Sequence, residues 1–199
     1  MDKIICLGKN YADHTSEMKE AQPDKPVLFI KPPSCFQEIK DGATIALPWE
    51  RGEIHHELEL VFKLYKKNVI GLGVGLDLTL RDLQKKLKAA GHPWEIAKSF
   101  KNSALVTPMK GTKDFGDWKN LEFTLKINGE IRQRGKISEA IMNPDEIIHH
   151  INDHFPICDS DLVFTGTPKG VGPLKPGDQI ELEYGPIKNH FKLSQHHYG

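Results

Sequence analysis

The chain has 199 residues, which is enough for one domain with a sizeable hydrophobic core. Lys and Arg together number 27, as do Asp and Glu, so the formal net charge of zero gives no electrostatic basis for binding nucleic acid or an anionic membrane. No apolar run approaches the roughly 20 residues of a membrane span, no secretory signal opens the chain, and three scattered cysteines argue against a disulfide framework. We therefore expect a single domain over residues 1–199 and a cytoplasmic location.

Short apolar segments in the first half of the chain are typical of strands. Between the first two of them, residues 11–20 are polar and indicate a short helix or a mobile segment. The expected strands are KIICLG (3–8), PVLFIK (26–31), ATIALP (43–48), ELELVFKLY (57–65) and the glycine-punctuated VIGLGVGLDLTL (69–80).

Two helices are expected further along the chain. The first covers residues 81–91, because its leucines recur at helical spacing and Gly91 provides a stop, with Thr79 as the N-cap. The second covers residues 143–155, where Asn143 caps the helix and the following proline and acidic residues suit its first turn. The histidines of this second helix are expected on a solvated face, because they have no cysteine or acidic partner at a zinc-like spacing.

The remaining segments complete a β-rich pattern. A hairpin is predicted about Asn128-Gly129, which is a strong turn signal. Residues 161–166 and 178–185 have the pattern of two further strands, joined by a loop rich in glycine and proline. Strands outnumber helices, which indicates an antiparallel or mixed β-fold with helices at its periphery.

The stretch HHELEL (55–60) places carboxylates in a segment that otherwise has the pattern of a buried strand. Because side chains alternate along a strand, His55, Glu57 and Glu59 share one face, and the two carboxylates are about 7 Å apart along the backbone. Like charges this close repel each other unless a cation or a proton neutralises them. Two carboxylates suit Mg²⁺ or Mn²⁺, whereas zinc would prefer more His or Cys. The alternative is a solvated strand face with ordinary surface glutamates.

A glycine stripe follows, in which Gly71, Gly73 and Gly75 share one strand face with Asp77 and Thr79. Glycine weakens a strand and usually marks the close approach of another group. Asp77 is then a natural third carboxylate for a cation, although helix capping or turn formation near Thr79 would account for it as well.

Taken together and in order, these motifs resemble the fumarylacetoacetate hydrolase superfamily, and most closely its small single-domain branch of acylpyruvases and oxaloacetate decarboxylases. The resemblance covers nearly the whole chain. It is carried by CLGKNYADHTSEM (6–18), PVLFIKP (26–32), HHELEL (55–60), GLDLTLRDLQ (75–84), PWEIAKSF (93–100), KINGEIRQ (126–133) and FTGTPKGVGP (164–173). It implies an α+β, β-dominated mixed β-roll of the fumarylacetoacetate hydrolase C-terminal domain type with a few peripheral helices, assembled as a homodimer.

The resemblance also implies a metal site and an acid–base pair. Glu57, Glu59 and Asp77 match the family's metal ligands, and the implied metal is Mg²⁺, with Mn²⁺ or Ca²⁺ as alternatives. His14 and Glu17 match the family's acid–base pair, in which the carboxylate would orient the imidazole and raise its basicity. From the residues alone, two polar side chains on an exposed helix are the simpler interpretation of this pair.

Four further positions carry over from matching motifs. Lys98 and Gln84 are expected to contact the substrate beside the metal, with Lys98 in a catalytic role. Arg81 matches a position near the site, and a structural ion pair is the alternative for it. Thr167 would offer backbone or hydroxyl contacts to a substrate carboxylate. Residues 10–22 are expected to form a mobile lid that orders over bound ligand.

The implied activity is that of a Mg²⁺-dependent enzyme acting on small 2-oxo carboxylates. It would hydrolyse the C–C bond of acylpyruvates, decarboxylate oxaloacetate, or do both, through a metal-stabilised enolate. An isomerase, tautomerase or hydratase of 2-oxo or 2-hydroxy-dienoate diacids would be a related alternative. Two other classes stay open: a metal-stapled β-module without catalysis, and an iron-dependent oxygenase that would use His55 as a ligand.

Overall fold

The computed structural model describes residues 1–12 and 25–194, and its largest element is a mixed sheet in the order β2-β1-β13-β6-β7-β9-β3, with β10 paired to β7. The β1–β13 and β3–β9 pairs are parallel, whereas β6 and β7 form a long antiparallel hairpin at its centre. The strands of this sheet are β1 (Ile4–Gly8), β2 (Val27–Lys31), β3 (Phe36–Glu38), β6 (Leu58–Tyr65), β7 (Asn68–Asp77), β9 (Ala104–Val106), β10 (Lys110–Gly111) and β13 (Leu162–Phe164).

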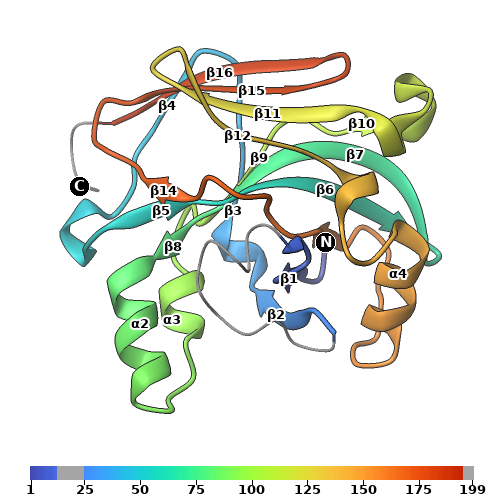
Figure 1. The fold of residues 1–199 in the computed structure, drawn as a ribbon, viewed down its shortest axis with the longest axis horizontal. Coiled ribbons are helices and arrows are strands. Elements are labelled where there is room, and N and C mark those ends of the chain that lie inside the picture. Colours follow the sequence, from blue (N-terminus) through green and yellow to red (C-terminus); the bar gives the residue numbers. More distant parts are fainter. Residues whose placement is uncertain (13–24, 195–199) are drawn as a thin grey trace.

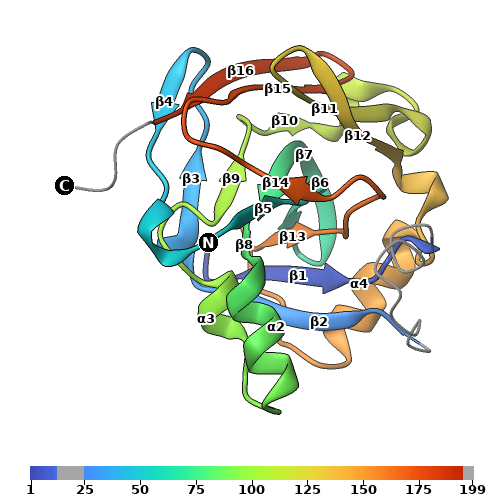
Figure 2. The ribbon, with the colours of Figure 1, turned by 60° about the vertical axis from the view of Figure 1, so that its left-hand side comes forward.

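A second sheet, in the order β12-β11-β15-β16-β4, lies across the β6–β7 hairpin (Figure 1). A small third sheet, β14-β5-β8, continues from the start of β6. Figure 2 shows that the strands curl around a common centre, as in a roll. The strands of these two sheets are β4 (Ala43–Ile45), β5 (Ile54–His56), β8 (Thr79–Leu80), β11 (Glu122–Ile127), β12 (Glu130–Lys136), β14 (Gly172–Pro173), β15 (Gln179–Tyr184) and β16 (Ile187–Leu193).

The α-helices of the described chain lie at the periphery of the sheets (Figure 1). They are α2 (Arg81–Ala89), α3 (Glu95–Lys98) and α4 (Pro144–Asn152). Short 3₁₀ turns occur at Pro33–Cys35, Trp49–Arg51, Thr112–Phe115, Trp118–Asn120 and Ile137–Glu139. None of the helices within 1–12 and 25–194 is long and apolar enough to cross a membrane. The expected β-dominated mixed fold with a few peripheral helices is confirmed.

One continuous hydrophobic core joins the inner faces of the two large sheets. Phe62 on β6 and Phe123 on β11 are fully buried within it. The ring of Tyr184 packs edge-on against Phe123 with 6.5 Å between centroids, while its hydroxyl donates to the Trp118 carbonyl oxygen over 2.8 Å. Burying large aromatic side chains from both sheets, with the one polar tip satisfied, holds the sheets together.

Most of the expected strands are present, but the acidic one is divided. The strand expected over residues 57–65 begins at Leu58, because Glu57 lies between β5 and β6. The motif HHELEL (55–60) therefore spans two strands. Strand β16 was not predicted from sequence, although IKNHFKL alternates buried and exposed residues along its whole length. The period-2 pattern of that segment was therefore a usable signal.

The two predicted helices occur, with different ends. Asn143 caps α4, where its Oδ1 accepts from the backbone N–H groups of Asp145 and Glu146. The prediction that Thr79 caps α2 was wrong, because Leu80 occupies that position and the Thr79 hydroxyl donates to Glu57 instead. The predicted hairpin turn is confirmed, with positive φ angles at Asn128 and Gly129.

The expectation of a solvated histidine face over residues 143–155 holds for His149 and His154 and fails for His150. His149 is exposed, whereas His150 is buried and its Nε2 lies 3.0 Å from the Pro26 carbonyl oxygen. His150 thus joins α4 to the segment that leads into β2, which the helical pattern alone could not show.

Candidate metal centre and active site

Glu57, Glu59 and Asp77 form a buried cluster in which one oxygen from each carboxylate lies within 4.8 Å of the others. The β6–β7 hairpin creates it, because Glu59 pairs with Gly75 across the strands. The Asp77 N–H donates to the Glu57 carbonyl oxygen over 2.9 Å, which brings the end of β7 beside the break between β5 and β6.

The glycine stripe on β7 makes room for groups that approach the hairpin closely. A Cβ atom on Gly75 would lie 2.7 Å from the Leu105 carbonyl oxygen, and one on Gly73 would lie 2.5 Å from Met109 Sδ. The interpretation of the glycines as positions of close approach is confirmed: strand β9 and the segment after it occupy this space.

Two buried lysines neutralise Asp77. Lys98 Nζ lies 2.6 Å from Asp77 Oδ2 and 2.8 Å from Glu57 Oε2, and so bridges two of the three carboxylates. Lys31 Nζ lies 2.5 Å from Asp77 Oδ1 and also donates to the Ser103 carbonyl oxygen over 2.6 Å. The contact of Lys31 with Oδ1 is an ion pair only, because Oδ1 accepts no hydrogen bond of good geometry from the residues that the structure describes.

Sequence reasoning did not identify Lys31 as part of the site. The signal that could have found it is strand alternation: in PVLFIK, Lys31 shares a face with Phe29, and both are buried. A lysine on the inner face of a strand needs a counter-ion, since an unpaired buried charge is costly. Asp77 is that counter-ion here.

Arg81 pairs with Glu57 and so holds this carboxylate in place. Its NH2 group lies 2.5 Å from Glu57 Oε1, and its NH1 group donates to Gln84 Oε1 over 2.9 Å. The Thr79 hydroxyl donates to the same Glu57 oxygen over 3.2 Å. Arg81 therefore is the structural ion-pair partner that the sequence offered as an alternative, and it also lies at the site.

Glu59 differs from the other two carboxylates. Its Oε2 accepts from the Gly166 N–H over 2.6 Å, but within the described residues it forms no ion pair, whereas Glu57 and Asp77 each form at least two. Burial raises the pKa of Glu59 well above its ordinary value, and the charges of Asp77 and Glu57 add to this shift. Within the described residues, the cluster thus contains one carboxylate, Glu59, whose charge no ion pair balances.

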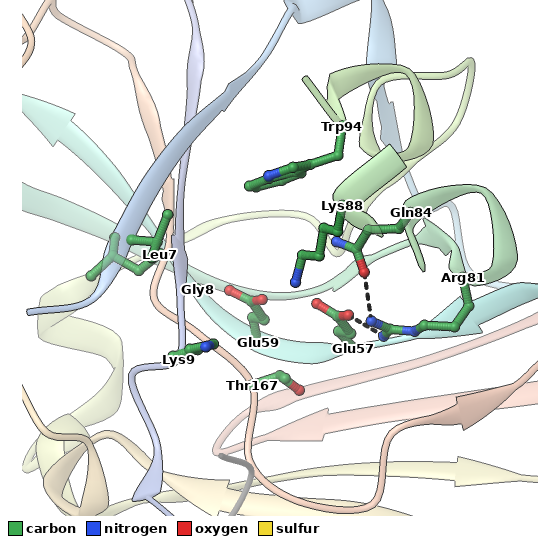
Figure 3. Close-up of a pocket in the computed structure, with 11 residues that line it drawn as sticks. Leu7, Gly8, Lys9, Glu57, Glu59, Arg81, Gln84, Lys88, Trp94 and Thr167 are labelled. Carbon is green, nitrogen blue, oxygen red and sulfur yellow. Dashed lines mark hydrogen bonds and ion pairs between the residues drawn. The ribbon is translucent and has the colours of Figure 1, made fainter. Parts of the chain in front are cut away.

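Above the cluster lies a cavity of about 290 Å³ (Figure 3). Glu57 and Glu59 line it together with Thr167, and Lys88 extends from α2 toward the two glutamates. The other lining residues are Leu7, Gly8, Lys9, Val27, Arg81, Gln84 and Trp94. A concave site of this size with several convergent polar groups suits a small polar ligand.

Thr167 accepts a hydrogen bond from Gln133, a residue that the sequence analysis did not identify. Gln133 Nε2 donates to Thr167 Oγ1 and to the Pro168 carbonyl oxygen, each over 2.8 Å. Its Oε1 accepts from the Leu58 N–H over 2.9 Å and lies 2.8 Å from His56 Nδ1. Burial lowers the pKa of His56 to about 4, so this imidazole is neutral at pH 7. The only sequence signal was that Gln133 ends the motif KINGEIRQ.

The structure therefore brings seven of the nine sequence-predicted site residues into one region. These are Glu57, Glu59, Asp77, Arg81, Gln84, Lys98 and Thr167. His14 and Glu17, and with them most of the predicted lid, lie outside the described residues. His55 pairs with Glu53 over 2.5 Å, and no histidine joins the carboxylate cluster in the described part of the chain, so nothing there supports an iron site with histidine ligands.

The carboxylate cluster fits a hard divalent cation. Carboxylate oxygens are the donors that Mg²⁺ and Mn²⁺ prefer. Asp77 Oδ1 accepts no hydrogen bond, and the charge of Glu59 has no ion-pair partner among the residues described. A cation held by these three residues would satisfy both.

Comparison with known proteins places the chain among related enzymes. A profile described as "Fumarylacetoacetate (FAA) hydrolase C-terminal" matches residues 3–192. The oxaloacetate tautomerase YcgM of Escherichia coli is 39% identical over 92% of this chain and 89% of its own length. The mitochondrial oxaloacetate tautomerase FAHD1 of Homo sapiens is 37% identical over 98% of this chain and 93% of its own.

Solved structures share the fold. Fumarylpyruvate hydrolase from Pseudomonas aeruginosa, in complex with Mn²⁺ and pyruvate, has a TM-score of 0.90 at 30% identity and is matched over 90% of its length by 98% of this chain. A fumarylacetoacetate hydrolase family protein from Yersinia pestis has a TM-score of 0.88 at 37% identity, with 96% of this chain and 92% of that one covered.

Proposed function

Because the chain belongs to the fumarylacetoacetate hydrolase family, we propose that it is a divalent-metal-dependent enzyme that forms the enolate of small 2-oxo dicarboxylates. Oxaloacetate tautomerisation is the first activity we assign to it. The observation that carries the proposal is the cluster of three buried carboxylates beside the Lys98 ammonium, at one end of a small cavity. Mg²⁺ or Mn²⁺ would be held by Glu57, Glu59 and Asp77.

The charge of the cavity supports a substrate that is anionic at both ends. Lys9 and Lys88 line the cavity in addition to the acidic cluster, and Lys88 Nζ lies 6.0 Å from the ring centroid of Trp94. A four-carbon diacid has few enough atoms for a cavity of about 290 Å³. The names of the relatives from Escherichia coli and Homo sapiens agree with oxaloacetate as the substrate.

The chemistry follows from the charges that surround the cluster. When bound, the cation would supply a Lewis acid that polarises the 2-oxo group of the substrate. Burial alone would lower the pKa of Lys98, but Asp77 and Glu57 raise it above its ordinary value, so Lys98 stays protonated. It is therefore a stabiliser of developing negative charge rather than a base.

The remaining roles concern orientation and proton transfer. Thr167 and Gln84 would bind the substrate, and Arg81 would hold Glu57 in place. His14 and Glu17 are proposed to move the proton at the carbon next to the 2-oxo group.

Hydrolysis of acylpyruvates is the second candidate. The sequence favoured hydrolysis or decarboxylation over tautomerisation, and the structural similarity to a fumarylpyruvate hydrolase supports keeping hydrolysis. All three reactions develop enolate charge beside Lys98. Hydrolysis additionally needs an activated water, which would be the task of His14 and Glu17. A metal-stapled module without catalysis would need neither Lys98 nor His14.

The test is kcat/KM for oxaloacetate tautomerisation, oxaloacetate decarboxylation and acylpyruvate hydrolysis, with Mg²⁺ or EDTA. We expect activity with Mg²⁺ and its loss in EDTA. His14→Ala should lower hydrolysis by about 10²–10⁴-fold, the usual contribution of a positioned base, and decarboxylation by less, because no water is attacked in that step. Lys98→Met should lower all three activities. Equal patterns for the two variants would contradict the division of roles, and inactivity of the wild type on every substrate would contradict the function.

A further inference from the structure

The hydrogen bonds around Gln133 have fixed directions, because two backbone groups determine them. The Leu58 N–H can only donate, so the Gln133 atom 2.9 Å from it is the amide oxygen. The Pro168 carbonyl oxygen can only accept, so the atom 2.8 Å from it is the amide nitrogen. Gln133 is 1% exposed, and the orientation of its amide follows from these two partners alone.

The remaining two partners of Gln133 then have no choice of role. His56 Nδ1, 2.8 Å from the amide oxygen, must carry a hydrogen and donate it. The second hydrogen of the Gln133 amide nitrogen is donated to Thr167 Oγ1 over 2.8 Å. The Thr167 oxygen thus acts as an acceptor toward Gln133, and its own hydrogen must point elsewhere.

Only a poor acceptor for that hydrogen is recorded among the described protein atoms. The Pro168 carbonyl oxygen is 3.4 Å from Thr167 Oγ1 and already accepts the shorter bond from Gln133. Thr167 lines the cavity that Glu57 and Glu59 also line (Figure 3). A bound carboxylate in that cavity would be a better acceptor, since hydrogen bonds to charged groups are shorter and stronger.

We propose that Gln133 is a positioning residue, which makes the Thr167 hydroxyl a hydrogen-bond donor toward the carboxylate of a bound 2-oxo acid. The identity of the ligand rests on the proposed function, whereas the direction of the hydrogen bonds does not. The loop after Thr167 is packed tightly on β12, because a Cβ atom on Gly170 would lie 2.2 Å from the Arg132 carbonyl oxygen. The packing of this loop therefore fixes the position of the Thr167 hydroxyl, and the bond from Gln133 fixes the direction in which it donates.

Gln133→Glu is the substitution that tests the direction. An ionised carboxylate can still accept from the Leu58 N–H and from His56, but it can no longer donate to Thr167 or Pro168. The Thr167 hydroxyl would then donate to the new carboxylate and turn away from the ligand. With saturating Mg²⁺ at pH 8, we expect the Kd of oxalate, measured by calorimetry, to rise roughly 10–100-fold. Protonating the new side chain at lower pH should restore binding relative to wild type at the same pH.

A double-mutant cycle separates this effect from simple charge repulsion. Thr167→Val removes the hydroxyl, so Gln133→Glu should weaken oxalate binding by less than about twofold in the Thr167→Val background. The same loss in both backgrounds would overturn the proposal, because the new charge would then act without the hydroxyl. Thr167→Ser, which keeps the hydroxyl, should bind oxalate more tightly than Thr167→Val does. Gln133→Met, which introduces no charge, should weaken oxalate binding by the same factor as Thr167→Val does.

A spectroscopic measurement tests the network without any ligand. In protein labelled with ¹⁵N-histidine, His56 should show a protonated Nδ1 and an unprotonated Nε2 at pH 7, and Gln133→Met should abolish this fixed tautomer. The opposite tautomer in the wild type would overturn the inference while leaving the proposed function intact. Wild-type protein that has the expected tautomer but no activity on 2-oxo acids would contradict the proposed function and leave the hydrogen-bond directions intact.

Discussion

Glu59 is the member of the carboxylate cluster that is buried without an ion-pair partner in residues 1–12 and 25–194. In that part of the chain, Glu57 and Asp77 pair with Lys31, Arg81 and Lys98, whereas Glu59 accepts one hydrogen bond, from the Gly166 N–H. As a proposed metal ligand, Glu59 would make the stability of the fold depend on the cation, since the free energy of metal binding adds to the free energy of unfolding.

Glu59→Gln should therefore have opposite effects with and without metal. In EDTA at pH 8 the variant should melt about 2–10 °C higher than wild type, because roughly 1–3 kcal/mol of desolvation is relieved, while Gln Oε1 still accepts from the Gly166 N–H. Added Mg²⁺ should stabilise the wild type and leave the variant unchanged. Glu130→Gln, at an exposed ion pair, is the control and should alter neither measurement. A variant that gains the full Mg²⁺ stabilisation would contradict the ligand set.

The pH dependence of the metal-free protein should have a definite sign. Burial raises the pKa of Glu59 in the folded state above the ordinary value of 4.5. Glu59 therefore does not lower the free energy of unfolding below pH 4.5. It lowers that free energy increasingly as pH rises above this value toward the pKa of the folded state, because Glu59 ionises first in the unfolded state. The difference in free energy of unfolding between Glu59→Gln and wild type should widen over this range. A difference that stays constant with pH would contradict the shift.

Helix α2 is the element that delivers several polar groups to one side of the cavity. Arg81, Gln84 and Lys88 are spaced at i, i+3 and i+7, so they lie on one face, whereas Lys85 is exposed on another. Strand β7 has a comparable role, since its glycines allow β9 to approach. Each element thus positions the site through its own periodicity.

Lys88→Met should change substrate preference more than catalysis. The substitution keeps the apolar stem beside Trp94 but removes the charge that faces the cavity. We expect kcat/KM for oxaloacetate to fall roughly 5–10-fold, because one charged hydrogen bond is lost, and kcat/KM for acetylpyruvate, whose distal end is uncharged, to change less than twofold. Lys85→Met is the matched control on the same helix. Equal losses on both substrates would show that Lys88 contacts the carboxylate they share.

For the whole molecule, the decisive feature is that both large sheets share one core and that the carboxylate cluster lies on the central hairpin. We therefore predict that the chain unfolds in a single transition, as expected of one domain. Mg²⁺ at 100 times its Kd should raise the midpoint by roughly 5–10 °C. Circular dichroism and tryptophan fluorescence should give coincident curves with and without metal. A second transition that responds to Mg²⁺ alone would contradict a single domain over residues 1–199. The homodimer expected from the resemblance stays a prediction for sedimentation analysis.

The sequence by itself determined the residue types of the site and the order of its motifs. HHELEL indicated a cation site because carboxylates in an apolar segment need a counter-charge, and the glycine stripe indicated the close approach of another group. Both arguments require only the alternation of side chains along a strand. The hairpin at Asn128-Gly129 and the cap at Asn143 were predictable for the same reason: their chemistry is local.

Only the tertiary structure decided which partners these residues have. Lys31 and Lys98 come from segments far from Asp77 in sequence. Gln133, on β12, bonds to Leu58 on β6 of the other large sheet and to Thr167 in the loop after β13. Hydrogen bonds and ion pairs of this kind depend on the relative placement of strands, which no local pattern encodes. Thr79 shows the same limit, because its hydroxyl has a buried carboxylate within reach and donates to that carboxylate rather than capping α2.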